Sequence, residues 1–234
     1  MTALRQFRSL IYSIPLCLLA TAFLVSGALL TATEDGIQMQ RRLFKLWARW
    51  ILWICRVRVR LNGFDALPTG GPYIFAANHV SLLDAPILIA AIPLDLCFLV
   101  KYRFIPVLEL FLYRTGQIAI RRANEAEERR TLEEAAESLP NDPRSLIVFP
   151  EAHRSTDEAT KFRDDPAFLA IASGRPLIPV RIEGVRAALP GKSTLIIGGT
   201  VDVYLGEPTS TEGLDPRTVT NQLRGQIAAL AHSH

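Results

Sequence analysis

Cysteine is scarce in this sequence. The 234-residue chain has only three, Cys17, Cys55 and Cys97, and their spacing matches neither a metal site nor a disulfide framework. The chain is therefore expected to fold without disulfides, in a reducing compartment. A large excess of charge of one sign is also lacking, because the formal net charge is +3. This modest charge gives no indication of a nucleic-acid partner.

Several common catalytic motifs are missing as well. The chain has no glycine-rich phosphate loop of the Rossmann or P-loop kind. It has no G-x-S-x-G elbow that would carry a serine nucleophile. The residues His79, Asp84, Glu151 and His153 follow no recognised metal motif, and neither repeats nor low-complexity segments occur. No cofactor and no metal ion are therefore expected.

A long uncharged run is present near the start. Leu10–Leu30 has 21 residues without a charge, about the length that crosses the hydrocarbon core of a bilayer. A cleaved signal peptide is the alternative, but the run is longer than a usual signal core. The sequence therefore predicts a retained membrane helix. This helix either spans the bilayer or forms a hairpin in one leaflet with the helix that follows.

The next stretch, Met39–Val57, has a different pattern. At about 100° per residue, one arc is apolar and rich in tryptophan, and the opposite arc is basic. The apolar arc contains Leu43, Leu46, Trp47, Trp50, Trp53, Ile54 and Val57, and the basic arc contains Arg42, Lys45, Arg49 and Arg56. Such a helix suits the headgroup interface of a membrane, and the alternative is a surface helix packed on its own domain. Residues 1–56 are predicted to be two membrane-anchoring helices, with Gly36 in a turn between them.

Residues 57–234 are predicted to form one α/β domain, because strand and helix patterns alternate along them. The predicted strands are Val57–Leu61, Tyr73–Ala77, Leu96–Val100, Gln117–Ile120, Ser145–Phe149, Pro176–Ile182, Thr194–Ile197 and Val201–Leu205. The predicted helices are Leu83–Ala91, Ile105–Thr115, Asn124–Leu139, Asp165–Ser173 and Pro216–Ala231. The expected fold is a mixed, largely parallel sheet flanked by helices. The highly charged helix Asn124–Leu139 is expected to be a solvated outer helix.

A histidine and an aspartate, His79 and Asp84, stand five positions apart in "AANHVSLLDAPIL". On one continuous helix they would point about 140° away from each other, so they meet only if His79 precedes the helix that Asp84 enters. Such a pair supports general-base catalysis, because a carboxylate that accepts one imidazole N–H leaves the other nitrogen to take a proton. The backbone of residues 78–81 would then offer donors to a developing oxyanion. Alternatively, Asp84 or Ser81 caps the helix and His79 is an ordinary turn residue.

Four ordered sequence blocks resemble the glycerolipid acyltransferases of the 1-acylglycerol-3-phosphate acyltransferase type. "NHVSLLD" (78–84) resembles the NHxxxxD block, and "FPEAHRS" (149–155) resembles FPEGTRS. "KYRFIPVLELFLYRTGQIAIRR" (101–122) resembles the block that a lysine opens and an arginine closes. "PLIPVRI" (176–182) resembles an apolar strand with a central proline. The resemblance runs from about Arg60 to Val185, and it implies that residues 57–234 are an acyltransferase domain.

The resemblance also implies roles for six residues. His79 would be the general base and Asp84 its orienting partner. Lys101, Arg122 and Arg154 would hold the acceptor's phosphate, and Glu151 would help to place its glycerol portion. A phosphate monoester is well bound by guanidinium groups, which agrees with the arginines. The alternatives are a solvated strand end at Arg121 and Arg122, and a structural ion pair between Arg154 and Glu151.

Two stretches depart from the family pattern. Ala152 and His153 replace the usual Gly-Thr, and alanine adopts a positive φ less freely than glycine. Arg163, Asp164 and Asp165 replace a stretch of the type lysine–x–glycine. The two additional acids favour an acceptor headgroup other than glycerol phosphate.

The function expected from this resemblance is transfer of a fatty acyl chain from acyl-CoA or acyl-ACP to the free hydroxyl of a lysophospholipid. The first expectation for the acceptor is 1-acylglycerol-3-phosphate, which gives phosphatidic acid. The alternatives are an ornithine or other amino lyso-lipid as acceptor, and a non-enzymatic membrane lipid-binding protein of the same fold. The expected partners are the bilayer, the acceptor and the acyl carrier. The expected location is a bacterial inner membrane, with the catalytic domain on the cytoplasmic side.

Overall fold

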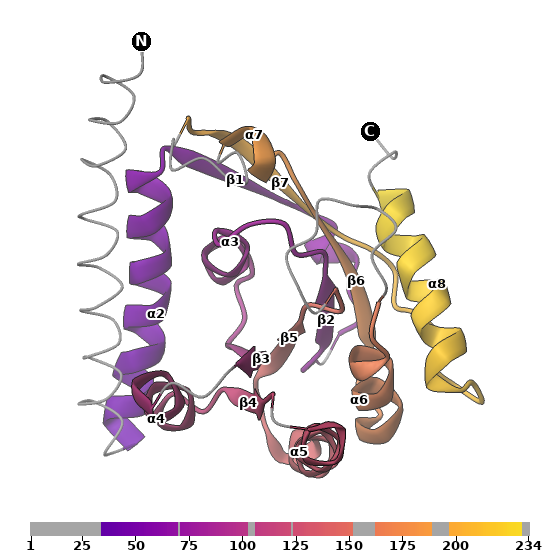
Figure 1. Ribbon diagram of the computed structural model, residues 1–234. Coiled ribbons are helices and arrows are strands. Elements are labelled where there is room, and N and C mark those ends of the chain that lie inside the picture. Colours follow the sequence, from indigo (N-terminus) through magenta and orange to yellow (C-terminus); the bar gives the residue numbers. More distant parts are fainter. Residues whose placement is uncertain are drawn as a thin grey trace. The chain divides into compact units, whose positions relative to one another are not determined.

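The computed structural model describes residues 34–69, 71–102, 106–122, 124–151, 162–188 and 197–230. It confirms an α/β fold, in which the strands form a seven-stranded sheet in the order β1-β7-β6-β2-β5-β3-β4 (Figure 1). The strands are β1 (Val57–Asn62), β2 (Ile74–Ala77), β3 (Leu96–Tyr102), β4 (Ile118–Arg121), β5 (Ser145–Val148), β6 (Leu177–Glu183) and β7 (Gly199–Leu205). The helices are α2 (Glu34–Ile54), α3 (Asp84–Ala91), α4 (Pro106–Arg114), α5 (Glu125–Ser138), α6 (Asp165–Ser173), α7 (Val185–Ala188) and α8 (Pro216–Ala229).

Two of the predicted elements fall outside these residues. The apolar run Leu10–Leu30 is outside them, and so is most of the predicted strand Thr194–Ile197. Among the helices that the structure describes, none combines the length and hydropathy needed to cross a membrane.

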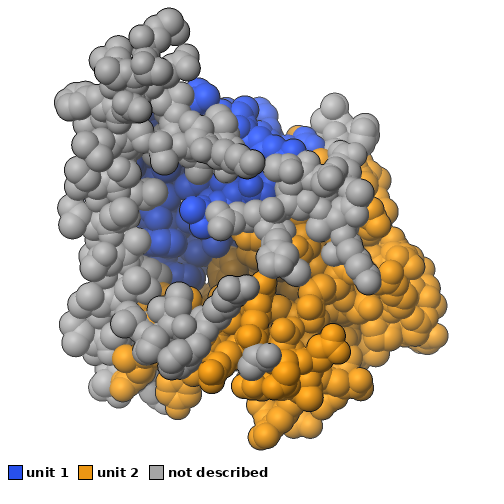
Figure 2. All heavy atoms as spheres, in the orientation of Figure 1, with its two compact units in different colours: residues 1–61, 80–93, 182–203 blue, residues 62–79, 94–181, 204–234 orange. Residues whose placement is uncertain are grey.

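The chain divides into two compact units, which Figure 2 colours separately. Unit 1 consists of residues 1–61, 80–93 and 182–203, and unit 2 consists of residues 62–79, 94–181 and 204–234.

Unit 2 contains a parallel set of strands. β2 pairs in parallel with both β5 and β6, and β3 pairs in parallel with both β5 and β4. The register places Ala76 opposite Val148, and Lys101 opposite Ile120. Because these strands run in one direction, the segments that follow β2, β3, β4 and β5 all leave the sheet at the same edge. In open α/β sheets this edge is where ligands bind.

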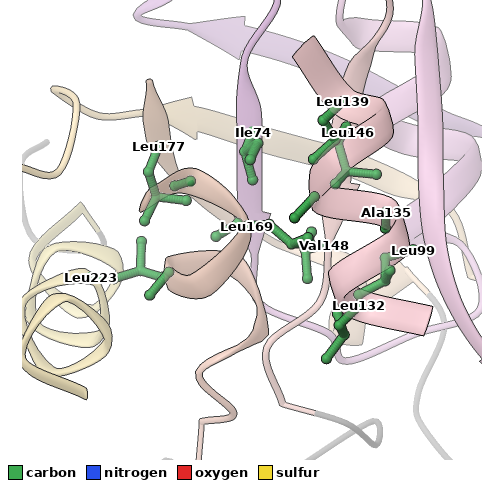
Figure 3. Packing of buried hydrophobic residues seen from close by; sticks show 14 of the residues in the cluster. Ile74, Leu99, Leu132, Ala135, Leu139, Leu146, Val148, Leu169, Leu177 and Leu223 are labelled. Carbon is green, nitrogen blue, oxygen red and sulfur yellow. The ribbon is translucent and has the colours of Figure 1, made fainter. Parts of the chain in front are cut away.

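The core of unit 2 lies between these strands and the helices α5, α6 and α8 (Figure 3). Branched and aliphatic residues such as Ile74, Leu146 and Leu169 are fully buried there, which provides most of the driving force for folding. On α5, only Leu132, Ala135 and Ala136 are buried, and its charged residues other than the partly buried Glu128 face solvent. The outer, solvated position expected for this helix is confirmed.

Unit 1 contains α2 and α3, which pack together. α2 begins at Glu34, so Gly36 lies within its first turn rather than between two helices, and that expectation was wrong. One glycine costs a helix only about 1 kcal/mol, and the long amphipathic stretch that follows outweighs this cost. The helix ends before Val57 because Arg56 adopts a left-handed φ of 55°, which a helix cannot continue.

The predicted tryptophan arc of α2 is only part of its apolar surface. A second face of the helix is buried and includes Ala48, Ile51 and Leu52. Trp50 and Trp53 stay 47% and 71% exposed, with their rings edge to face at 5.4 Å. α2 is therefore packed on its own unit by one face, and it also presents exposed tryptophans on another.

Candidate active site

The turn after β2 is held by the carboxylate of Asp84. Asp84 is fully buried in the first turn of α3. Its Oδ2 accepts hydrogen bonds from the backbone N–H groups of Val80 at 2.7 Å and of Ser81 at 2.8 Å. Ser81 Oγ accepts a further bond from the N–H of Leu83 at 3.2 Å. The amides of Val80 and Ser81 are thus already bonded to Asp84, so the expectation that they serve a developing oxyanion was wrong for these two residues.

The ring of His79 is placed by an aromatic neighbour. His79 lies two residues beyond the buried end of β2 and is itself partly exposed. Its imidazole stacks on the ring of Phe149, with centroids 4.3 Å apart and planes 25° apart. Phe149 in turn stacks with Phe98 at 6.4 Å. The histidine therefore lies at the edge of the sheet where the parallel strands end, with one ring face covered and its position fixed by packing.

Lys101, near the end of β3, is engaged by two carboxylates. Its Nζ lies 2.6 Å from Asp165 Oδ2 and 3.3 Å from Glu128 Oε2. Arg163 pairs with the same two oxygens, at 3.2 Å from Asp165 and 3.0 Å from Glu128. Only 8% of the Lys101 side chain is exposed. The predicted phosphate ligand is thus part of a network of two cations and two anions, in which only Arg163 is well exposed, at 42%.

Lys101 and His79 lie on opposite faces of the sheet. Lys101 is in register with the core residue Ile120 and is paired with carboxylates on or next to α5 and α6. It therefore points to the face that these helices cover. Phe98 is three positions from Lys101 on β3, and side chains an odd number of positions apart on a strand point to opposite faces of the sheet. The ring of Phe98 therefore lies on the other face, together with the rings of Phe149 and His79 that stack there. The sheet edge thus has an aromatic face at the histidine and an ionic face at the lysine.

The arginines at the end of β4 are close to the end of β3. Arg121 is in register with Tyr102, and the backbone N–H of Arg122 donates to the carbonyl of Tyr102 at 2.8 Å. Burial raises the pKa of the Tyr102 phenol, and the carboxylate of Glu109 on α4 raises this pKa further, while Arg121 opposes them. Tyr102 is therefore a neutral hydrogen-bonding group at neutral pH, beside cationic side chains.

Glu151 lies three residues beyond β5 and is buried, with 8% of its surface exposed. Next to it, the carbonyl of Pro150 accepts a hydrogen bond of 2.9 Å from the N–H of Arg163. This bond links the chain just after β5 to the chain just before α6. Arg154, together with the departures Ala152 and His153, falls outside the residues that the structure describes.

Asp164 and Asp165, which depart from the family pattern, both have partners within unit 2. Asp165 binds Lys101 and Arg163, and Asp164 lies 3.5 Å from the guanidinium of Arg217 on α8. The sequence suggested that these acids favour an acceptor headgroup other than glycerol phosphate. Their contacts instead hold α6 against β3 and α8, so their effect on the headgroup would be indirect.

Three side chains of this site were missed in the sequence. Phe149 and Phe98 support the histidine ring, and Glu128 completes the ionic network. The aromatic residue that opens "FPEAHRS" was a visible signal for Phe149. No sequence signal distinguished Glu128 from the other acids of its helix.

The described residues contain neither a metal-binding cluster nor an ionised thiol. Among the residues with described positions, no group of three or more His, Cys, Asp and Glu is arranged to hold a metal ion. Burial raises the pKa of the Cys55 and Cys97 thiols to about 11. Both thiols therefore stay protonated and weakly nucleophilic at neutral pH.

Comparisons with known proteins show which family the chain belongs to. A family model described as "Acyltransferase" matches residues 58–183. The 1-acyl-sn-glycerol-3-phosphate acyltransferase of Saccharomyces cerevisiae is 30% identical over 180 residues, which cover 71% of this chain and 59% of the yeast protein. The lyso-ornithine lipid O-acyltransferase of Pseudomonas aeruginosa is 27% identical over 210 residues, which cover 82% of this chain and 80% of that protein.

A solved structure has the same fold. The crystal structure of the 1-acyl-sn-glycerophosphate acyltransferase of Thermotoga maritima superposes with a TM-score of 0.73, and the match covers 98% of this chain and 99% of that one. At 22% sequence identity, this likeness shows the fold alone.

Proposed function

Because the chain belongs to the Acyltransferase family, we propose that it transfers a fatty acyl chain from acyl-CoA or acyl-ACP to the free hydroxyl of a lysophospholipid. The acceptor is 1-acylglycerol-3-phosphate and the product phosphatidic acid. The observation that supports this most is the turn at the sheet edge. There, a histidine stacked on Phe149 directly precedes backbone that is bonded to the buried Asp84.

In the proposed mechanism, one ring nitrogen of His79 removes the proton of the acceptor hydroxyl. The hydroxyl oxygen attacks the thioester carbonyl, the C–S bond breaks, and the leaving thiolate takes the proton back from the imidazolium. Asp84 orients His79 and stabilises its cationic form. Proton transfer of this kind contributes about 10²–10⁴-fold to a rate, and no cofactor takes part.

Arginine side chains hold the acceptor phosphate in this proposal. Arg122 follows β4 at the same edge as His79, and Arg154 follows the buried Glu151. Forked guanidinium groups suit a phosphate because they bind two of its oxygens at once. Glu151 places the glycerol portion. Lys101 was predicted from the sequence as a further phosphate contact, but its ammonium group is engaged by Asp165 and Glu128, so the arginines carry this binding in the proposal.

A second candidate acceptor is an amino lyso-lipid such as a lyso-ornithine lipid. The coverage of the relatives favours it, because the chain spans 80% of the Pseudomonas protein but 59% of the yeast protein. The carboxylates at Lys101 favour it too, because they reduce the positive charge available to a phosphate. Both candidates use the same base and the same attack on a thioester.

A panel of acceptors tests the proposal. Purified full-length protein is incubated with palmitoyl-CoA and, separately, with 1-acylglycerol-3-phosphate, lysophosphatidylethanolamine and a lyso-ornithine lipid, and the products are identified by mass spectrometry. We expect acceptor-dependent release of CoA thiol and formation of phosphatidic acid. A diacylated ornithine lipid as the main product would select the second candidate. Absence of transfer to every acceptor, with either thioester carrier, would contradict the enzymatic assignment and leave a lipid-binding protein.

The exposed tryptophans of α2 support placement at a membrane surface, which suits an enzyme whose acceptor lies in a bilayer while its acyl carrier is soluble. We propose that this face enters the headgroup region, with the catalytic domain on the cytoplasmic side of a bacterial inner membrane. Indole rings and basic side chains both favour this region.

Tryptophan fluorescence tests this placement directly. The three tryptophans of the chain are Trp47, Trp50 and Trp53, and all of them lie on α2, so the signal reports on this helix alone. We expect vesicles containing brominated lipids to quench the fluorescence. A variant that keeps only Trp53, which is 71% exposed, should be quenched more than one that keeps only the half-buried Trp47. Equal accessibility to acrylamide with and without vesicles would contradict membrane contact by this face.

A further inference from the structure

The ionic network at Lys101 is balanced in charge. Lys101 and Arg163 supply two positive charges, and Glu128 and Asp165 supply two negative charges, all linked by contacts of 2.6 to 3.3 Å. The exposed fractions of the Lys101, Asp165 and Glu128 side chains are 8%, 10% and 17%, whereas Arg163 at the outer side of the network is 42% exposed. Because screening by water is weak where side chains are this buried, the carboxylates cancel most of the attraction of Lys101 for an anion.

Lys101 is also costly to redirect toward a ligand. Its Nζ would have to leave Asp165 at 2.6 Å, and the carboxylate left behind would be buried and partly uncompensated. In addition, the ammonium group points to the α5 and α6 face of the sheet, whereas His79 lies on the opposite face with Phe149. In this chain, the two carboxylates therefore hold Lys101 away from an acceptor at the histidine, and their loss would let its flexible side chain, next to the last residue of β3, turn toward that acceptor.

We propose that Asp165 and Glu128 determine acceptor specificity by holding Lys101 in this balanced network. This lowers the preference for a doubly charged phosphate monoester, and it lets headgroups without net charge compete. The inference rests on the proposed function, because it concerns the acceptor of the same reaction. Asp165 is the stronger of the two determinants, because its carboxylate is the closer partner and the more buried one. Both are positioning residues that act through Lys101.

The test compares two acceptors that differ in headgroup charge and share the reacting hydroxyl, 1-acylglycerol-3-phosphate and 1-acyl-lysophosphatidylethanolamine. The ratio of their kcat/KM values is measured for the wild type, Asp165→Asn and Glu128→Gln. We expect the ratio to shift toward the phosphate monoester by about tenfold in Asp165→Asn and by less in Glu128→Gln, mainly through KM. A second substitution, Lys101→Met in the Asp165→Asn background, should reverse the shift.

Glu133→Gln is the matched control. Like Glu128→Gln, it removes one negative charge from α5. Glu133 is half exposed, however, and among the described contacts it pairs only with the exposed Arg129. This variant should leave the ratio unchanged. If the network were merely structural, Asp165→Asn would lower kcat/KM for both acceptors by the same factor, and their ratio would stay unchanged. That result would overturn the proposal. A selective loss of the phosphate acceptor in Lys101→Met alone would overturn it too.

Calorimetric titration with glycerol 3-phosphate decides the inference without catalysis. We expect Asp165→Asn to bind this probe about tenfold more tightly than the wild type, Glu128→Gln to show a smaller gain, and Glu133→Gln to bind it equally. Equal binding by all the variants would refute the role of the carboxylates. If the wild type transfers acyl chains to no acceptor, the proposed function fails, and the titration still tests whether these acids restrain Lys101.

Discussion

Replacement of His79 by alanine is expected to reduce kcat for acyl transfer by about 10²–10⁴-fold, the usual contribution of a positioned general base. The acceptor hydroxyl would then have to lose its proton to water. Binding of acceptor and carrier should change little, so KM should stay close to the wild-type value. The measurement is thiol release from palmitoyl-CoA at saturating acceptor, with wild type and variant side by side.

The fold should tolerate this substitution, because His79 is partly exposed and lies after β2 rather than within it. The temperature of unfolding serves as the control for intact structure. A well-folded variant with kcat within about threefold of the wild type would remove the histidine from the mechanism, because a base worth at least about 10²-fold cannot then be at work.

Two replacements of Asp84 should separate its two roles. Asp84→Ala removes the acceptor of two backbone hydrogen bonds. Hydrogen bonds to a charged group contribute about 1.5 kcal/mol or more each, so a loss of about 3 kcal/mol in the free energy of unfolding is expected. Asp84→Asn keeps an oxygen that accepts from Val80 and Ser81, so it should lose less stability. Denaturant unfolding of both variants measures this difference.

The activity of Asp84→Asn is the sharper test. The variant lacks the charge that would stabilise the imidazolium of His79, so kcat should fall by about 10²-fold or more even though the turn is retained. Ser81→Ala is the control, because it removes one bond to the Leu83 N–H in the same turn and leaves the carboxylate in place. If Asp84→Asn kept full activity, Asp84 would be a structural residue of the turn only.

Local patterns in the sequence predicted most elements of the fold to within a few residues. Helix α3 was expected at Leu83–Ala91 and is found at Asp84–Ala91, because Pro86 and the polar turn before it mark where the helix starts. The end of α2 was missed, because a left-handed φ at Arg56 is rare for a residue of its type.

The contacts of the site were harder to predict than its residues. The motif put His79 and Asp84 in one turn, but the stacking partner Phe149 directly follows another strand, β5, and is 70 positions further along the chain. The network at Lys101 joins β3 to Glu128 on α5 and Asp165 on α6. Each of these contacts depends on how segments that are distant in the sequence pack together. Hydrophobic periodicity and secondary-structure propensity are local properties and do not predict such packing. The residues Asp164 and Asp165, which suggested a different headgroup, are bound within unit 2.

The most direct measurement is a crystal structure of the protein with 1-acylglycerol-3-phosphate and an unreactive thioether analogue of acyl-CoA. The proposal predicts the free hydroxyl of the acceptor within about 2.6–3.2 Å of a ring nitrogen of His79, with the carbonyl of the analogue beside that hydroxyl and the phosphate at Arg122. An acceptor bound with its hydroxyl turned away from the imidazole, or a phosphate held by other residues, would contradict the account.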